Sequence, residues 1–159
     1  METLWSPWRM KYITDYGNPD KCVFCTAPSF VDGPENLIVH RGDKVFAILN
    51  LFPYTSGHLM IVPYEHHPSM ENFEPAVRAE IMEMVNEAIK ILRKVYKPQG
   101  FNVGINLGTA AGAGIAEHMH IHIVPRWNGD TNFMSTVGET RVLPEELETT
   151  YKRLAAAWK

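Results

Sequence analysis

Three histidines alternate with apolar residues in the stretch His118-Met119-His120-Ile121-His122. Successive side chains of a β-strand point to opposite faces, so these imidazoles should share one face, with next neighbours about 6 to 7 Å apart. The alternating apolar side chains would face the core and hold the rings in a fixed row. Such a row can act on a phosphate or hold a metal ion.

The same residues leave three other interpretations open. His-x-His on a strand is a common zinc-binding arrangement, so the active site could be purely metal-based. The row could also bind a nucleotide without turning it over. Finally, the histidines could be ordinary surface and core residues, although strict alternation of three argues against this.

The segment before the histidines is suited to an anion. Residues 101–107 alternate apolar with small or polar side chains, and pairing of this strand with the histidine strand would put Asn106 on the imidazole side. The connecting loop, 108–115, consists mostly of glycine and alanine, so its backbone N–H groups can approach a ligand closely. The loop residues expected to line a phosphate are Gly112, Ala113, Gly114 and Ile115.

Cys22 and Cys25 form a Cys-x-x-Cys pair and are the only cysteines in the chain. In a reducing compartment such a pair indicates half of a metal site or a redox motif rather than a structural disulfide. The plainer alternative is two reduced, buried thiols.

Five strands must position these side chains. Short apolar or alternating segments bounded by turn residues predict strands over 37–40, 45–50, 58–62, 101–107 and 119–124. Short connections, interrupted once by a long helix, favour mostly antiparallel pairing. The predicted class is therefore α+β, a five-stranded antiparallel sheet with one long packed helix and a C-terminal helix.

The helices are predicted from spacing and from their ends. Apolar residues recur at helical spacing from Phe73 to Tyr96, and this amphipathic helix should stop before Pro98. A last helix should begin near Pro144, with Glu145 and Glu146 in its first turn, where carboxylates suit the helix dipole. Residues 1–35 are expected to be irregular.

Composition limits the class of protein. With 159 residues, 45% of them hydrophobic, the chain suits one domain over 1–159, with 127–159 as a C-terminal extension. A net charge of −3 gives no basic field for nucleic acid, but local donors could still hold a small anion. No apolar run reaches the roughly 20 residues of a membrane span, and no signal peptide is evident, so we expect a cytoplasmic protein without a membrane partner.

At the alternating histidines the chain resembles the histidine triad superfamily, whose signature is three histidines separated by single apolar residues. The resemblance extends from about Cys22 to Phe133. The stretch Pro125–Met134 and the opening Leu4–Arg9 look most like bacterial relatives of diadenosine tetraphosphate phosphorylases, near the fragile-histidine-triad branch. The resemblance implies a homodimer that cleaves dinucleoside polyphosphates or related substrates at the α-phosphate, passing the nucleotide to water or to phosphate.

The resemblance also implies roles for single residues. His120 would be the nucleophile on the α-phosphorus, and His122 would bind the phosphate and assist the leaving group. Asn106 would stabilise charge on the phosphate oxygens, and Asn50 would hold the ribose. The side chains expected to form the wall of the base pocket are Phe46, Leu49 and His58. For Phe46 and Leu49, plain core packing is an equal alternative.

One departure from the family concerns the residues before the triad. Many relatives carry a serine or threonine there that donates to the phosphate, whereas this chain has Gly114-Ile115-Ala116-Glu117. Backbone N–H groups of the loop would have to replace that hydroxyl.

The resemblance further implies a zinc site. In several relatives a Cys-x-x-Cys pair binds zinc with two histidines, which here would be His66 and His118, with His67 as the nearest wrong choice for the third ligand. Cys22, Cys25, His66 and His118 form a closed tetrahedral set typical of structural zinc. Such a zinc would tie the N-terminal segment to the core and orient His118 without taking part in the chemistry.

Overall fold

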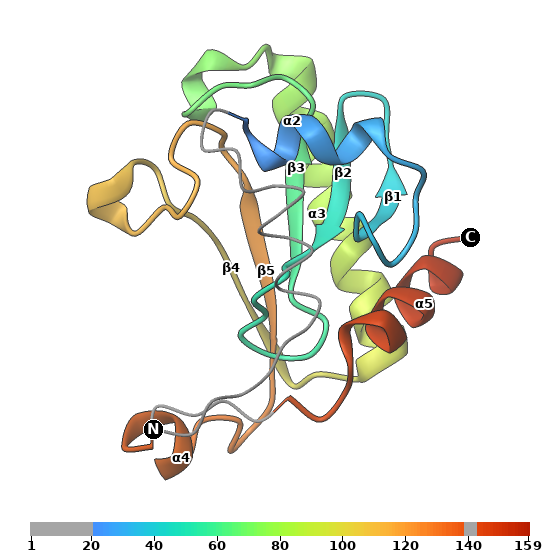
Figure 1. The fold of residues 1–159 in the computed structure, drawn as a ribbon, viewed down its shortest axis with the longest axis vertical. Coiled ribbons are helices and arrows are strands. Elements are labelled where there is room, and N and C mark those ends of the chain that lie inside the picture. Colours follow the sequence, from blue (N-terminus) through green and yellow to red (C-terminus); the bar gives the residue numbers. More distant parts are fainter. Residues whose placement is uncertain (1–20, 139–142) are drawn as a thin grey trace.

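The computed structural model describes residues 21–138 and 143–159 (Figure 1). The opening Leu4–Arg9 and most of the segment expected to be irregular lie outside these ranges. Within 21–35 the structure differs from that expectation, because a short helix α2, Val23–Thr26, is followed by a 3-10 turn, Ala27–Ser29. The N–H groups of Cys25 and Thr26 bond to the carbonyl of Cys22 and close this first turn.

The predicted five-stranded antiparallel sheet is confirmed, with strand order β1-β2-β3-β5-β4. Its strands are β1 (Ile38–Arg41), β2 (Val45–Leu49), β3 (Leu59–Pro63), β4 (Gly100–Ile105) and β5 (Ile121–Arg126). The histidine strand β5 lies between β3 and β4, so its first residues emerge where both neighbours end.

The long helix α3, Pro75–Tyr96, covers one face of the sheet, and α2 lies over the other face (Figure 1). Pro75 occupies the first turn, where its missing N–H costs nothing, and Lys97 ends the helix in the left-handed conformation. The remaining short elements are 3-10 turns Met70–Asn72 and Thr109–Ala111 and helix α4, Phe133–Thr136. None of the helices in the described ranges has the length and hydropathy that a membrane span would need.

The last helix, α5, is Leu147–Ala157, three residues later than expected from Pro144. Glu145 lies outside it, because its carboxylate accepts hydrogen bonds from the hydroxyls of Tyr96 and Thr150 and pairs with Arg153. These contacts fix the approach of the chain to α3, and Glu146 then serves as the N-cap.

The histidine row begins before the regular strand, which differs from the prediction of a strand over 119–124. β5 pairs with both neighbours only from Ile121 onwards, since β4 ends at Ile105 and the ladder with β3 ends at Ile61. Met119 still donates its N–H to the carbonyl of His67 at 2.8 Å, so the preceding segment is held in place.

Gly57, directly before His58, has φ +81°, and a Cβ there would lie 3.1 Å from Leu92 and 3.2 Å from Tyr96. Gly129 has the same φ of +81° with open space around it. We expect Gly129→Ala to lower the free energy of unfolding by about 1–2 kcal/mol through backbone strain alone, and Gly57→Ala by about 2–4 kcal/mol through strain plus overpacking. Urea denaturation of both variants measures the difference; equal losses would contradict the close packing beneath His58.

Candidate active site and metal centre

His120 is held with one ring nitrogen committed and the other available. It is 6% exposed, and its Nδ1 lies 2.9 Å from the carbonyl oxygen of His118. A carbonyl can only accept, so Nδ1 carries the proton and Nε2 keeps its lone pair. Burial lowers the pKa of His120, which keeps the ring neutral at pH 7. The geometry therefore presents an uncharged nitrogen nucleophile.

A second imidazole pair fixes the proton on His122. The backbone N–H of Tyr54 donates to Nδ1 of His58 at 3.1 Å, so His58 carries its proton on Nε2. That Nε2 lies 2.9 Å from Nδ1 of His122 and donates to it. His122 is left with its proton on Nε2, and its ring lies 4.8 Å from that of His120. The predicted base-wall residue His58 is thus fully buried behind His122 and orients it.

The burial of His122 predicts a pH dependence of stability. Desolvation, with a smaller effect of His120, lowers the pKa of His122 to about 4, whereas an unfolded histidine has a pKa near 6.5. Between these values the unfolded chain binds more protons than the folded chain, so stability is full above about pH 6.5 and falls as the pH drops towards 4. Urea unfolding of metal-free protein at pH 7 and pH 4.5 should show this loss. The loss of stability between pH 7 and pH 4.5 should be smaller in His122→Asn. An equal loss in the variant and the wild type would contradict the assignment of this effect to His122.

Asn106 and the glycine-rich loop follow β4 and lead to the first histidine of the row. The register pairs Gly104 with His122, so Asn106, two residues further on, is on the imidazole face as predicted from alternation. Gly112 ends the 3-10 turn with φ 89°, and Ala113 and Ile115 are half-buried while Gly114 is exposed.

Asn50 lies beside His58 at the end of β2. Its Oδ1 accepts from the N–H of Phe52 at 2.9 Å, and its Nδ2 lies 3.5 Å from both ring nitrogens of His58. The side chain is half-buried, and its orientation is fixed by these contacts.

The strand register separates the two apolar residues expected to line a base pocket. Phe46 pairs with Val62 and lies on the imidazole face, but it is fully buried. Leu49 pairs with Leu59, which pairs with Ile123, so Leu49 faces α3, away from His122. We therefore do not include Leu49 in the proposed site. Its neighbour Ile48 is on the imidazole face, a position that alternation from Phe46 could have indicated.

Phe24 also belongs to the site and was not singled out from the sequence. It is 2% exposed, and its ring centroid lies 4.8 Å from that of His120 and 5.5 Å from that of His118. Because Phe24 stands between Cys22 and Cys25 on α2, the cysteine pair and the nucleophile are parts of one packed unit.

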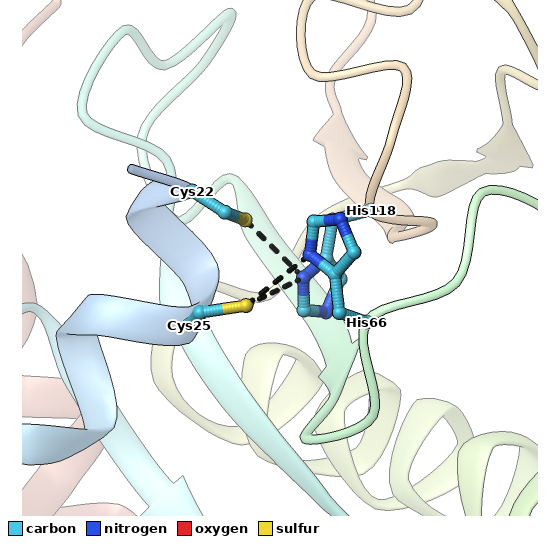
Figure 2. A group of neighbouring side chains, drawn as sticks. All are labelled: Cys22, Cys25, His66 and His118. Atoms are coloured by element: carbon cyan, nitrogen blue, oxygen red, sulfur yellow. Dashed lines mark hydrogen bonds between the residues drawn. The ribbon is translucent and has the colours of Figure 1, made fainter. Parts of the chain in front are cut away.

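The four predicted metal ligands converge, and their donor atoms all lie within 4.8 Å of one another (Figure 2). Sγ of Cys22 is 3.3 Å from Nδ1 of His118, and Sγ of Cys25 is 3.2 Å from Nδ1 of His66. The edge between a sulfur and a nitrogen ligand of tetrahedral zinc is about 3.6 Å, so the residues fit that ion. The set is compatible with zinc.

The protonation of His118 supports this arrangement. Its Nε2 donates to the carbonyl of Pro63 at 2.8 Å, which leaves Nδ1 as a lone pair directed at the cysteines. His67 instead contacts Glu65 at 3.4 Å and packs on Phe73, apart from the cluster. Both cysteines are free thiols, and burial, followed by the neighbouring Cys22, raises the pKa of Cys25 to about 11. A bound cation would stabilise the thiolates and so offset the free-energy cost of deprotonating the thiols.

Comparison with known proteins gives the same family as the site. The family model of the HIT domain matches residues 33–129. AP-4-A phosphorylase of Mycobacterium tuberculosis is 42% identical over 166 aligned residues, covering 99% of this chain and 85% of the relative. The asymmetrical bis(5'-nucleosyl)-tetraphosphatase of Schizosaccharomyces pombe is 28% identical, covering 76% of this chain and 63% of the relative.

A solved structure of a histidine triad protein has the same fold. A zinc-bound histidine triad family protein from Mycobacterium smegmatis superimposes with a TM-score of 0.69 at 27% identity, covering 87% of this chain and 93% of that chain. The fold, the alternating histidines and the near-complete alignment agree, and the chain is a member of the HIT family.

Proposed function

We propose that this protein cleaves dinucleoside polyphosphates at an α-phosphate through a covalent nucleotidyl-His120 intermediate. The observation that carries the proposal is the hydrogen bond from Nδ1 of His120 to the carbonyl of His118, which leaves the lone pair of Nε2 unprotonated. The names of the two curated relatives, a phosphorylase and a tetraphosphatase of such nucleotides, support the substrate class.

In the first step, the Nε2 lone pair of His120 forms a bond to the α-phosphorus. The bond from phosphorus to the bridging oxygen breaks, and the leaving polyphosphate takes the electron pair. Nε2–H of His122 donates a hydrogen bond to the leaving oxygen, and His58 keeps the His122 ring in that orientation. The positive charge that develops on His120 is stabilised through its Nδ1–H by the His118 carbonyl.

In the second step, an acceptor oxygen attacks the same phosphorus and releases His120. Attack by water requires loss of a proton, yet His122 accepts from His58 on one nitrogen and carries a proton on the other, so it is not arranged as a base. Inorganic phosphate already carries an anionic oxygen and needs no base. The tautomers therefore favour phosphate as the acceptor, with nucleoside diphosphate as product.

The remaining proposed contacts are with the nucleotide. Asn106 and the N–H groups of residues 112–115 would stabilise the phosphate oxygens in place of the missing hydroxyl. Asn50 would hold the ribose, and Ile48 and Phe24 are the apolar side chains nearest to a base pocket beside the triad. Phe46 contributes to its floor.

Zinc, when bound, supplies a structural crosslink between α2 and the segment that carries the histidines. Cys22, Cys25, His66 and His118 would hold it through two sulfur and two nitrogen atoms. The chain's own part is to keep the His118 carbonyl in position for His120. A thiolate site of this kind fits a reducing compartment such as the cytoplasm.

We further propose that two copies associate through β4. This strand is at the edge of the sheet, and it leaves Val103 46% exposed, with Leu107 beyond it 43% exposed. An apolar edge strand is a template for pairing with another strand, and a second copy would cover it.

Incubation with diadenosine tetraphosphate, with and without inorganic phosphate, tests the function. ADP plus ATP formed only with phosphate means phosphorolysis, and AMP plus ATP means hydrolysis. Binding without either product would show a nucleotide-binding regulator and overturn the proposal. Loss of activity on chelation, together with full activity of a His120→Gln variant, would instead indicate metal-based hydrolysis.

A further inference from the structure

A groove of about 1090 Å³ opens next to His122 and extends away from the metal site. One wall is formed by the imidazole face of β4 and β5, from Asn106 and His122 to Arg126, and the other by residues 54–56, by residues 143–145 before α5 and by Arg153 on α5. Its volume is at the upper end of that of small-molecule sites. The groove therefore has room for a ligand part as large as a nucleoside beyond the reacting phosphate.

The charges of the groove are paired within the protein. Arg126 contacts both carboxylate oxygens of Asp130, at 2.7 and 2.8 Å, and holds the pKa of that carboxyl far below its usual range. At the other end Arg153 pairs with Glu145. Because each guanidinium has its own carboxylate, the groove offers no surplus positive charge for further phosphates. It suits an uncharged, polar and aromatic group.

Tyr54 provides a flat surface where the groove meets the triad. Its ring lies 6.1 Å from that of His122 at an interplanar angle of 15°, and 4.5 Å from that of His58. Tyr54 is nevertheless 47% exposed. An aromatic ring that packs beside the triad and is about half exposed can stack on a base.

We propose that this groove binds the nucleoside of the leaving half of the substrate, with its base stacked on Tyr54. The inference rests on the proposed function and adds a specificity: the enzyme would select substrates with a nucleoside at both ends of the phosphate chain. Asn102, whose side chain lies on the opposite wall formed by β4 and β5 and accepts from Arg126 at 2.6 Å, would be a polar contact for that nucleoside.

Two substrates isolate the contribution of the second nucleoside. Diadenosine tetraphosphate and adenosine 5'-tetraphosphate share the adenylyl group and four phosphates, and only the first has a leaving nucleoside. We expect kcat/KM of the wild type to be about 5- to 160-fold higher for diadenosine tetraphosphate, which is a stacking energy of about 1–3 kcal/mol expressed as a rate ratio. Tyr54→Leu should reduce this ratio to within about threefold of one, and Asn102→Phe, which fills the groove from the other wall, should also lower it.

Phe52 supplies the matched control, since it belongs to the same loop, is 49% exposed and does not line the groove. Phe52→Leu should leave the substrate ratio unchanged. A wild-type ratio near one, or equal losses on both substrates in Tyr54→Leu, would overturn the subsite while leaving nucleotidyl transfer intact. Cleavage of neither substrate by the wild type would overturn the proposed function, and the subsite with it.

Discussion

Replacing His120 with glutamine should lower turnover of diadenosine tetraphosphate by at least about 10⁴-fold, the scale observed when a covalent nucleophile is removed. The amide retains hydrogen-bonding capacity at a buried position but has no basic ring nitrogen. Binding of AMP, measured by calorimetry, should therefore change by less than about tenfold. The variant would therefore lose the step that forms the covalent bond and keep its binding of the nucleotide.

A histidine outside the site provides the control for this variant. His40 lies on β1, and its ring stacks on that of Trp158, the C-cap residue of α5, with the ring centroids 5.1 Å apart. His40→Gln should retain turnover within about twofold. If the folded His120→Gln variant, with a Tm close to that of the wild type, kept substantial activity, the ring nitrogen would not be the nucleophile.

Removing the proposed zinc by chelation should produce the largest change in stability. A ligand that binds only the folded state at 100 to 1,000 times its Kd adds about 2.7–4.1 kcal/mol. For a domain of this size each kcal/mol shifts Tm by about 2–4 °C, so chelation should lower Tm by about 5–15 °C. Turnover should fall as well, because the carbonyl that orients His120 belongs to His118, a residue of the proposed zinc site.

Two adjacent histidines separate ligation from surface effects. His66→Ala should lose the metal, as determined by elemental analysis of protein purified without added zinc, and its Tm should match that of the chelated wild type. His67→Ala should retain both metal and Tm, because His67 contacts Glu65 and Phe73 instead. An apo protein with unchanged Tm and full activity would show that the cluster holds no structural metal.

The sheet and the long helix could be predicted because their apolar periodicity matches burial. The ladder β2-β3-β5 is almost entirely buried, and the apolar positions from Val77 to Leu92 on α3 face it. The start of α5 could not be predicted, because side-chain contacts of Glu145 with Tyr96 and Arg153, far apart in sequence, decide where helical geometry begins.

Part of the candidate site could likewise be predicted from the sequence, and part of it could not. Alternation alone brought His118, His120 and His122 to one face, and the family resemblance supplied His66 as the partner of the cysteines. Leu49 and Ile48 differ by one position, and only the register with β3 shows which of them faces the imidazoles. The orienting role of His58 depends on which nitrogen of each ring is protonated, which is set by the N–H of Tyr54 and is not encoded in any spacing.

Trapping the covalent intermediate tests the central claim most directly. Wild-type protein mixed with diadenosine tetraphosphate without phosphate, quenched in base within milliseconds and analysed by intact and peptide mass spectrometry, should carry one adenylyl group. That group should be acid-labile, located on His120, and discharged to ADP when phosphate is added. Product formation with no adduct at any time, or an adduct on another residue, would contradict the account.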